Sequence, residues 1–125
     1  MATSGSDKPR VLIVDDDGMI CSFLRVMLRG DGYDVVGEAH SAEKLVERCA
    51  STRAQVVLLD INMPGMDGIK ALEALHSAHP GVKVIMISAE ATLDRVKEAL
   101  AKGASGFIVK PFNAATVLDD LARCL

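Results

Sequence analysis

The stretch "LLDINMPGMDG", residues 58–68, joins a run of apolar residues to an aspartate and then to a short turn. The apolar run starts at Val56, and such continuous runs are typical of parallel strands that helices cover on both faces. The run ends at Asp60, and a buried carboxylate without a partner is costly to the fold. We therefore expect Asp60 to lie at the tip of a strand, with a cationic group beside it.

Four other segments combine Val, Ile and Leu in a similar way: VLIVD at 11–15, YDVVGEA at 33–39, KVIMIS at 83–88 and GFIVK at 106–110. Between them, apolar residues recur with the period of about 3.6 that is typical of amphipathic helices. Five helices are expected, around residues 20–28, 41–50, 69–75, 93–100 and 117–121. Ser41 would be the N-cap of the second helix. This alternation predicts an α/β fold with a doubly wound, five-stranded parallel sheet and helices on both faces.

Length, composition and charge fit one globular domain. The chain has 125 residues, of which 50% are hydrophobic and 25% charged, with a formal net charge of −3. Residues 1–8 are mostly small and polar and are expected to form a disordered tail before a domain at 9–125. Because no basic stripe is present, we expect no direct binding of nucleic acid. No apolar run approaches the ~18 residues of a membrane span, so we expect a cytoplasmic protein without membrane contact.

Cysteine and histidine usage suggests neither disulfides nor zinc. The cysteines at positions 21, 49 and 124 are widely spaced, and no C-x-x-C occurs, so free thiols are expected. None of the three histidines, His40, His76 and His79, is a convincing metal ligand from the sequence. His76 and His79 are three residues apart on an expected helix, but no third ligand is near them in the sequence.

Polar side chains follow the expected strands at the edge where open α/β sheets bind their ligands. Acids at 15–17 follow the first strand, Asp60 ends the third, Ser88 ends the fourth and Lys110 ends the fifth. Two or three carboxylates that lie close together repel each other and need a cation. Lys110 would supply one positive charge, and Mg²⁺, which prefers oxygen ligands, would supply the other.

The acids provide a magnesium site in outline. Asp16 and Asp60 can ligate directly, a backbone carbonyl after Asp60 can add a ligand, and Asp15 can hold a bound water. Mn²⁺ would fit the same ligands. A carboxylate, a divalent ion, a lysine and a hydroxyl are together the components of phosphoryl transfer to an aspartate.

Four motifs in this order resemble the receiver domain of two-component response regulators, and most of all the chemotaxis-type single-domain receivers. They are "VDDD" at 14–17, "LLDINMPGMDG" at 58–68, "MISAE" at 86–90 and "GASGFIVKPF" at 103–112. The resemblance extends over the chain from Arg10 onward. It implies the flavodoxin-like strand order 2-1-3-4-5, which the doubly wound class also allows.

The resemblance assigns roles to the acidic residues and to the lysine. Asp60 would be the phosphoacceptor. Asp16, Asp60 and the backbone carbonyl of Asn62 would hold Mg²⁺, and Asp15 would bind it through water. Lys110 would pair with the phosphoryl group, and its bond to the following proline would be cis.

The resemblance also implies a switch. Ser88 would turn toward the phosphoryl group, and Phe107 would rotate with it, although tyrosine is often found at that position and Phe107 has no hydroxyl. Asn62 and Glu90 lie two residues after Asp60 and Ser88, where receivers tune the lifetime of the phosphoryl group. This pair predicts rapid self-dephosphorylation. Asp17 is expected to be a bystander or a helix N-cap.

The implied function is signalling and not turnover of a separate substrate. A sensor histidine kinase or a histidine phosphotransfer protein would donate the phosphoryl group. The surface of the fourth helix, fifth strand and fifth helix would then control an output partner that the sequence does not identify. Homodimerisation on activation would fit the resemblance as well.

Three alternatives have weaker support. "DDDGM" at 15–19 is similar to the opening motif of haloacid-dehalogenase-type hydrolases, but Met19 replaces the threonine and no acidic pair follows Lys110 at a strand end. A pseudo-receiver would act as an interaction module without phosphorylation. Flavin binding would need a phosphate-binding loop after the first strand, and the sequence has no Ser/Thr/Gly-rich segment there.

Overall fold

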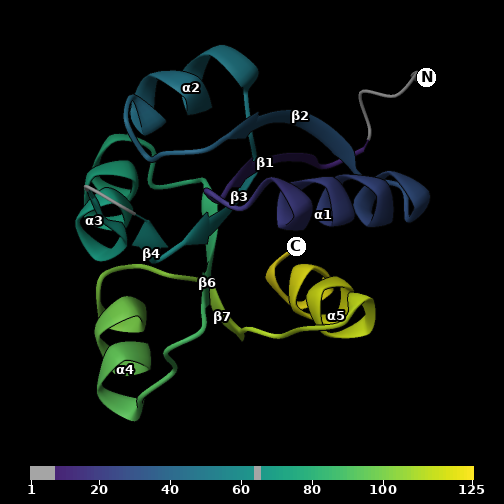
Figure 1. Ribbon diagram of the computed structural model, residues 1–125. Coiled ribbons are helices and arrows are strands. Elements are labelled where there is room, and N and C mark those ends of the chain that lie inside the picture. Colours follow the sequence, from purple (N-terminus) through teal and green to yellow (C-terminus); the bar gives the residue numbers. More distant parts are fainter. Residues whose placement is uncertain (1–7, 64–65) are drawn as a thin grey trace.

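The computed structural model describes residues 8–63 and 66–125 (Figure 1). Five parallel strands form its large sheet: β1 (Arg10–Val14), β2 (Asp34–Ala39), β3 (Val56–Asp60), β6 (Lys83–Ser88) and β7 (Gly106–Val109). Their order across the sheet is β2-β1-β3-β6-β7. When only these five strands are counted, this is the order 2-1-3-4-5, so the predicted fold is confirmed.

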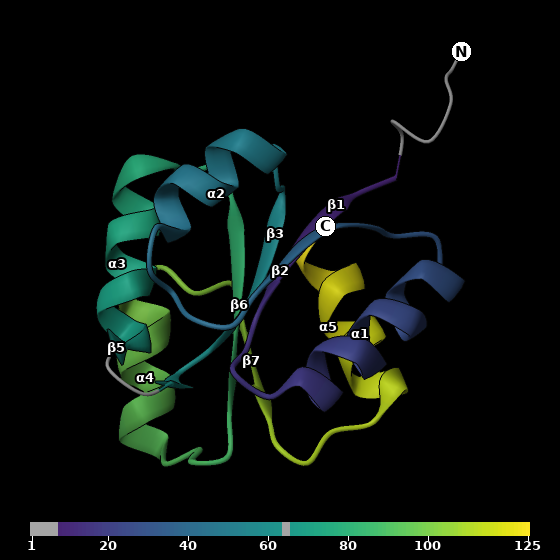
Figure 2. The ribbon, with the colours of Figure 1, turned by 45° about the horizontal axis from the view of Figure 1, so that its top comes forward.

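In the described residues, four helices connect the strands and a fifth follows β7: α1 (Gly18–Gly30), α2 (Leu45–Thr52), α3 (Gly68–Ala78), α4 (Leu93–Ala101) and α5 (Ala114–Cys124). Figure 2 shows α1 and α5 on one face of the sheet and α2, α3 and α4 on the other. Both faces are therefore covered, which explains why the interiors of the central strands β1, β3 and β6 are continuous apolar runs and do not alternate with polar residues.

The two faces of the sheet hold separate hydrophobic clusters. Val11 and Ile13 of β1 pack with the α1 and α5 side, whereas Leu12 and Val14 pack with the side of α2, α3 and α4. All four side chains are fully buried. This alternation follows from the two-residue period of a strand, which directs successive side chains to opposite faces.

The expected N-cap of the second helix is wrong. The helix α2 begins at Leu45, and its N-cap position is Lys44, which has a left-handed φ of 60° and no capping side-chain hydrogen bond. Ser41 instead accepts a hydrogen bond from the Glu43 backbone N–H at 3.3 Å. Serine side chains compete in this way for nearby backbone groups and stabilise turns, so the residues after Ser41 form a turn and the helix starts later.

A short antiparallel pair of strands, β4 (Asn62–Met63) and β5 (Met66–Asp67), was not expected. It lies between the end of β3 and the start of α3. The side chain of Asp67 caps α3 by accepting a hydrogen bond from the Ile69 N–H at 2.9 Å. The pair therefore connects the segment after Asp60 directly to the helix that follows.

The predicted disordered tail at 1–8 lies outside the described residues, except for Lys8, which is exposed. Within residues 8–63 and 66–125, no helix is long and apolar enough to cross a membrane.

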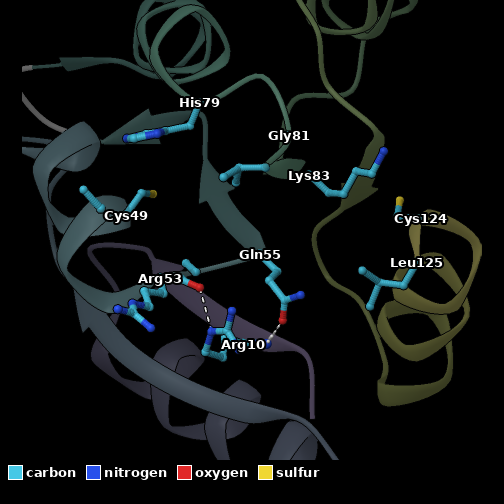
Figure 3. A pocket seen from close by; sticks show the side chains of 12 residues that line it. Arg10, Cys49, Arg53, Gln55, His79, Gly81, Lys83, Cys124 and Leu125 are labelled. Atoms are coloured by element: carbon cyan, nitrogen blue, oxygen red, sulfur yellow. Dashed lines mark hydrogen bonds between the residues drawn. The ribbon is translucent and has the colours of Figure 1, made fainter. Parts of the chain in front are cut away.

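The amino ends of the strands form the edge of the sheet that faces away from the predicted site. Arg10 and Gln55 are joined there by reciprocal hydrogen bonds of 3.0 and 2.8 Å. A pocket of about 490 Å³ opens at this edge, and Arg10, Lys83 and Leu125 are among its lining residues (Figure 3). None of the predicted site residues lines it, and the first and last parts of the described domain meet here.

Candidate functional site

The carboxyl ends of the central strands place the predicted residues at one edge of the sheet. Asp15 directly follows β1, Asp60 ends β3, Ser88 ends β6 and Lys110 directly follows β7. The first three are polar residues with exposed fractions of 0, 2 and 0%. In a parallel sheet the carboxyl ends of neighbouring strands lie at the same edge. The strand pairing therefore explains why these four polar residues are close together.

Lys110 lies between the two buried carboxylates. Its Nζ atom is 3.0 Å from Asp15 Oδ2 and 3.4 Å from Asp60 Oδ2. Burial lowers the pKa of Lys110, but the two carboxylates raise it by more, so that the net pKa lies above its ordinary value. The lysine therefore carries a fixed positive charge at neutral pH, and it is the cationic partner that the sequence predicted for Asp60.

Asp15, Asp16 and Asp60 form a group of carboxylates in which one oxygen from each lies within 4.8 Å of the others. Asp16 is exposed, so the group opens to solvent on that side. Asp15 Oδ2 is buried, and its partner among the described residues is the Lys110 ammonium at 3.0 Å. A cluster of carboxylate oxygens with unused acceptor capacity fits a hard divalent cation such as Mg²⁺.

The carboxyl group of Asp60 has a pKa above its ordinary value. Burial is the main cause and the charge of Asp15 is the second, and together they outweigh Lys110 and the backbone N–H of Asn62. That N–H donates to Asp60 Oδ1 at 3.1 Å. One lysine therefore does not compensate fully for two buried carboxylates, and the site favours additional positive charge.

Ser88 is hydrogen-bonded within its own loop and to Asn62. Its Oγ donates to the Glu90 carbonyl at 3.2 Å, accepts from the Glu90 N–H at 3.0 Å, and accepts from Asn62 Nδ2 at 3.2 Å. Asn62 Nδ2 also lies 3.4 Å from Glu90 Oε1. The two residues that were expected to tune lifetime are thus in contact with each other and with the switch serine, which sequence spacing does not reveal.

The remaining predicted residues lie close by. Phe107 is half-buried and packs against the cluster on the side of α2, α3 and α4, and it is paired in register with Met86. The bond between Lys110 and Pro111 is cis, as the resemblance implied. Asp17 is the N-cap of α1 and accepts hydrogen bonds from two backbone N–H groups, which confirms that expectation.

One neighbour of the site was missed. Cys21, on the buried face of α1, donates a hydrogen bond from Sγ to the Asp15 carbonyl at 3.3 Å. One ligand-type atom each of Cys21, Glu38 and His40 lies within 4.8 Å of the others. Sequence spacing does not place Cys21 and Glu38 beside His40. Its neighbours are brought to it by the register of β1 against β2 and by the orientation of α1, and no motif carries that information.

Comparisons with known proteins agree with the site and the fold. The family model of the response regulator receiver domain matches residues 11–122. The chain belongs to this family. The receiver domain is 38% identical over 114 residues to chemotaxis protein CheY of Listeria monocytogenes, covering 91% of this chain and 96% of that protein. Chemotaxis protein CheY of Thermotoga maritima is also 38% identical over 114 residues, and the match covers 91% of this chain and 95% of that protein.

Solved structures of CheY proteins have the same fold as this chain. CheY4 of Vibrio cholerae superposes with a TM-score of 0.87 at 32% identity, covering 94% of this receiver domain and 99% of that chain. A complex of CheX and CheY with BeF₃ and Mg²⁺ from Borrelia burgdorferi gives a TM-score of 0.88 at 36% identity, covering 92% of this receiver domain and 87% of that chain.

The receiver domain is therefore a CheY-like component of a two-component system. The family match spans nearly the whole chain, which sets aside the hydrolase and flavin-binding alternatives.

Proposed function

We propose that this receiver domain accepts a phosphoryl group onto Asp60 from the phosphohistidine of a sensor histidine kinase or of a histidine phosphotransfer protein. The observation that carries this proposal is the buried carboxylate of Asp60, which lies 3.4 Å from the Lys110 ammonium and within 4.8 Å of two other carboxylates. Asp16, Asp60 and the backbone carbonyl of Asn62 would hold Mg²⁺, with Asp15 bound through a water.

In the transfer, an Asp60 oxygen attacks phosphorus in line, and the bond from phosphorus to the donor imidazole nitrogen breaks. The electron pair of that bond stays on the imidazole. Lys110 faces the developing charge with its ammonium group, and the Asn62 N–H orients the Asp60 carboxylate through the 3.1 Å hydrogen bond. When bound, Mg²⁺ supplies positive charge to the phosphoryl oxygens, which a single lysine only partly neutralises.

Phosphorylation would release Ser88 from its present contacts. The phosphoryl group adds nearly two negative charges and strong acceptor oxygens, which compete for the Ser88 hydroxyl with the Glu90 carbonyl. Movement of Ser88 leaves room into which the half-buried Phe107 can turn. The shift would be transmitted to the surface of α4, β7 and α5, where Leu93, Leu100 and Val109 are exposed apolar side chains that a partner could cover.

The phosphorylated state is proposed to be short-lived. The Asn62 Nδ2 atom lies 3.2 Å from Ser88 Oγ and 3.4 Å from Glu90 Oε1. The carboxamide and the carboxylate are therefore adjacent to each other beside the Ser88 hydroxyl. A carboxylate and a carboxamide beside the phosphoryl group can orient a water for hydrolysis of the acyl phosphate.

Intact-mass measurement tests this function. Wild-type protein incubated with acetyl phosphate and Mg²⁺ should gain the mass of one phosphoryl group, whereas Asp60→Ala and wild type with EDTA should not. Asp119→Ala, an exposed acid on α5, is the matched control and should be phosphorylated like wild type. A wild-type protein that stays unmodified with acetyl phosphate, and also with a phosphorylated histidine donor, would favour the pseudo-receiver alternative.

A further inference from the structure

Three side chains with different ligating atoms meet beside the acidic site. Cys21 belongs to α1, Glu38 belongs to β2, and His40 directly follows β2. One ligating atom of each lies within 4.8 Å of the others. None of the three has a role in the phosphoryl transfer proposed above, so their convergence needs a separate explanation.

The group is closed at one end and open at the other. The Cys21 side chain is fully buried, Glu38 is half-buried and His40 is exposed. An ion could therefore reach the group from solvent past the imidazole and be held at depth by the sulfur. The imidazole of His40 lies at the solvent side and the sulfur of Cys21 at the buried side, so an ion would travel only a short distance from solvent to the sulfur.

Glu38 is oriented by an arginine of α1. Its buried Oε2 atom lies 2.7 Å from Arg25 Nη2 in an ion pair. A carboxylate has two oxygens, so the guanidinium can hold one while the other faces a metal. Such outer contacts orient ligating carboxylates in known metal sites.

The surroundings of Cys21 are negatively charged. Burial is the main cause that raises the pKa of the thiol to about 11, and the charges of Asp15 and Glu38 add to it. The thiol is therefore protonated when no metal is bound, and a bound metal must displace that proton to solvent. The same carboxylates attract a divalent cation, which offsets this cost.

We propose that Cys21, Glu38 and His40 form a second metal site that takes Zn²⁺ or a similar divalent ion with affinity for sulfur and nitrogen. Three protein ligands with a fourth position left for water are a common zinc arrangement. Ligand atoms of a tetrahedral zinc centre lie about 3.5 Å apart. The present separations are at most 4.8 Å, so they need to shrink by about 1.3 Å at most. Mg²⁺ prefers oxygen ligands, so the acidic cluster and this group select different metals.

Titration with Co²⁺, in the presence of saturating Mg²⁺, tests the proposal. Cobalt bound to a thiolate produces an intense charge-transfer band in the near ultraviolet and weaker bands in the visible. We expect this band to saturate at one equivalent of Co²⁺ and to disappear when Zn²⁺ is added. His40→Gln and Glu38→Gln should each weaken cobalt binding at least tenfold, and Cys21→Ser should abolish the band.

Matched variants separate this site from other sources of the signal. Cys124→Ser removes a thiol elsewhere in the fold, and Asp60→Ala removes the acidic cluster, so both should keep the band. Because His40 is exposed, His40→Gln should fold normally even if Cys21→Ser does not, and circular dichroism checks both. A missing band in wild type, a band that survives in Cys21→Ser, or a band that Asp60→Ala removes would each overturn the proposal.

Discussion

Replacing Asp60 with asparagine should stabilise the protein when no divalent metal is present. Asp60 and Asp15 have carboxylate oxygens within 4.8 Å of each other, and at an effective dielectric constant of about 20 two charges at that distance repel by about 3.5 kcal/mol. The attraction between Asp60 and Lys110 at 3.4 Å is about 5 kcal/mol on the same scale. Burying the carboxylate costs several kcal/mol more, so the balance is unfavourable to the charged form.

The net gain for Asp60→Asn at pH 7 should be about 1–2 kcal/mol in the free energy of unfolding. The amide keeps an oxygen for the Asn62 N–H, and Lys110 keeps its ion pair with Asp15. The pKa of Asp60 is raised in the folded state, so the penalty is absent below the ordinary pKa, grows as the pH rises from there to the raised pKa, and is complete above it. The difference between variant and wild type should thus vanish as the pH falls below 3.8, the ordinary value.

Urea unfolding in EDTA, followed by far-ultraviolet circular dichroism, measures this difference, because the chain has no tryptophan and a single tyrosine. The midpoint should rise without a change in slope. Asp119→Asn, at an exposed position on α5, should stay within about 0.5 kcal/mol of wild type. Mg²⁺ should stabilise wild type more than Asp60→Asn. An Asp60→Asn variant that is less stable than wild type in EDTA at pH 7 would refute the reasoning about burial and repulsion.

Three further changes test the fold and the proposed lifetime. Gly68→Ala should lower the free energy of unfolding, measured by urea unfolding, by about 2 kcal/mol or more, because a Cβ atom there would lie 2.5 Å from the Ile61 Cα. Gly81→Ala is the control: a Cβ atom at this position would have no neighbour within 4 Å, so the variant should be nearly as stable as wild type. Asp17→Ala should cost about 1 kcal/mol, measured by urea unfolding, since it removes the cap of α1. Glu90→Ala should slow the release of phosphate from phosphorylated protein severalfold; an unchanged rate would remove Glu90 from the hydrolysis step.

The strands, the helices and the edge that carries the site could be predicted from sequence because they depend on repeating patterns. Continuous apolar runs define buried parallel strands, and the carboxyl ends of such strands lie at one edge whatever the loops do. Asp60 and Lys110 are therefore brought together by topology, and their ion pair follows from the need to compensate a buried carboxylate.

The predictions that were wrong, and the features that were missed, concern contacts that no sequence pattern encodes. Ser41 has a capping side chain, but the left-handed Lys44 shows that the chain continues as a turn there. The two-residue strands β4 and β5 are too short to have any periodicity. The hydrogen bonds of Asn62 with Ser88 and Glu90, and the meeting of Cys21 with Glu38 and His40, depend on side-chain directions that only the folded backbone fixes.

Arg10 and Leu125 line the same pocket at the amino edge of the sheet, whereas Asp60 lies at the carboxyl edge. A reporter or another domain joined before β1 or after α5 would therefore be attached on the side remote from the phosphoacceptor and would not shield it from a donor. This geometry leaves both ends of the described domain open to fusion without crowding the acidic site.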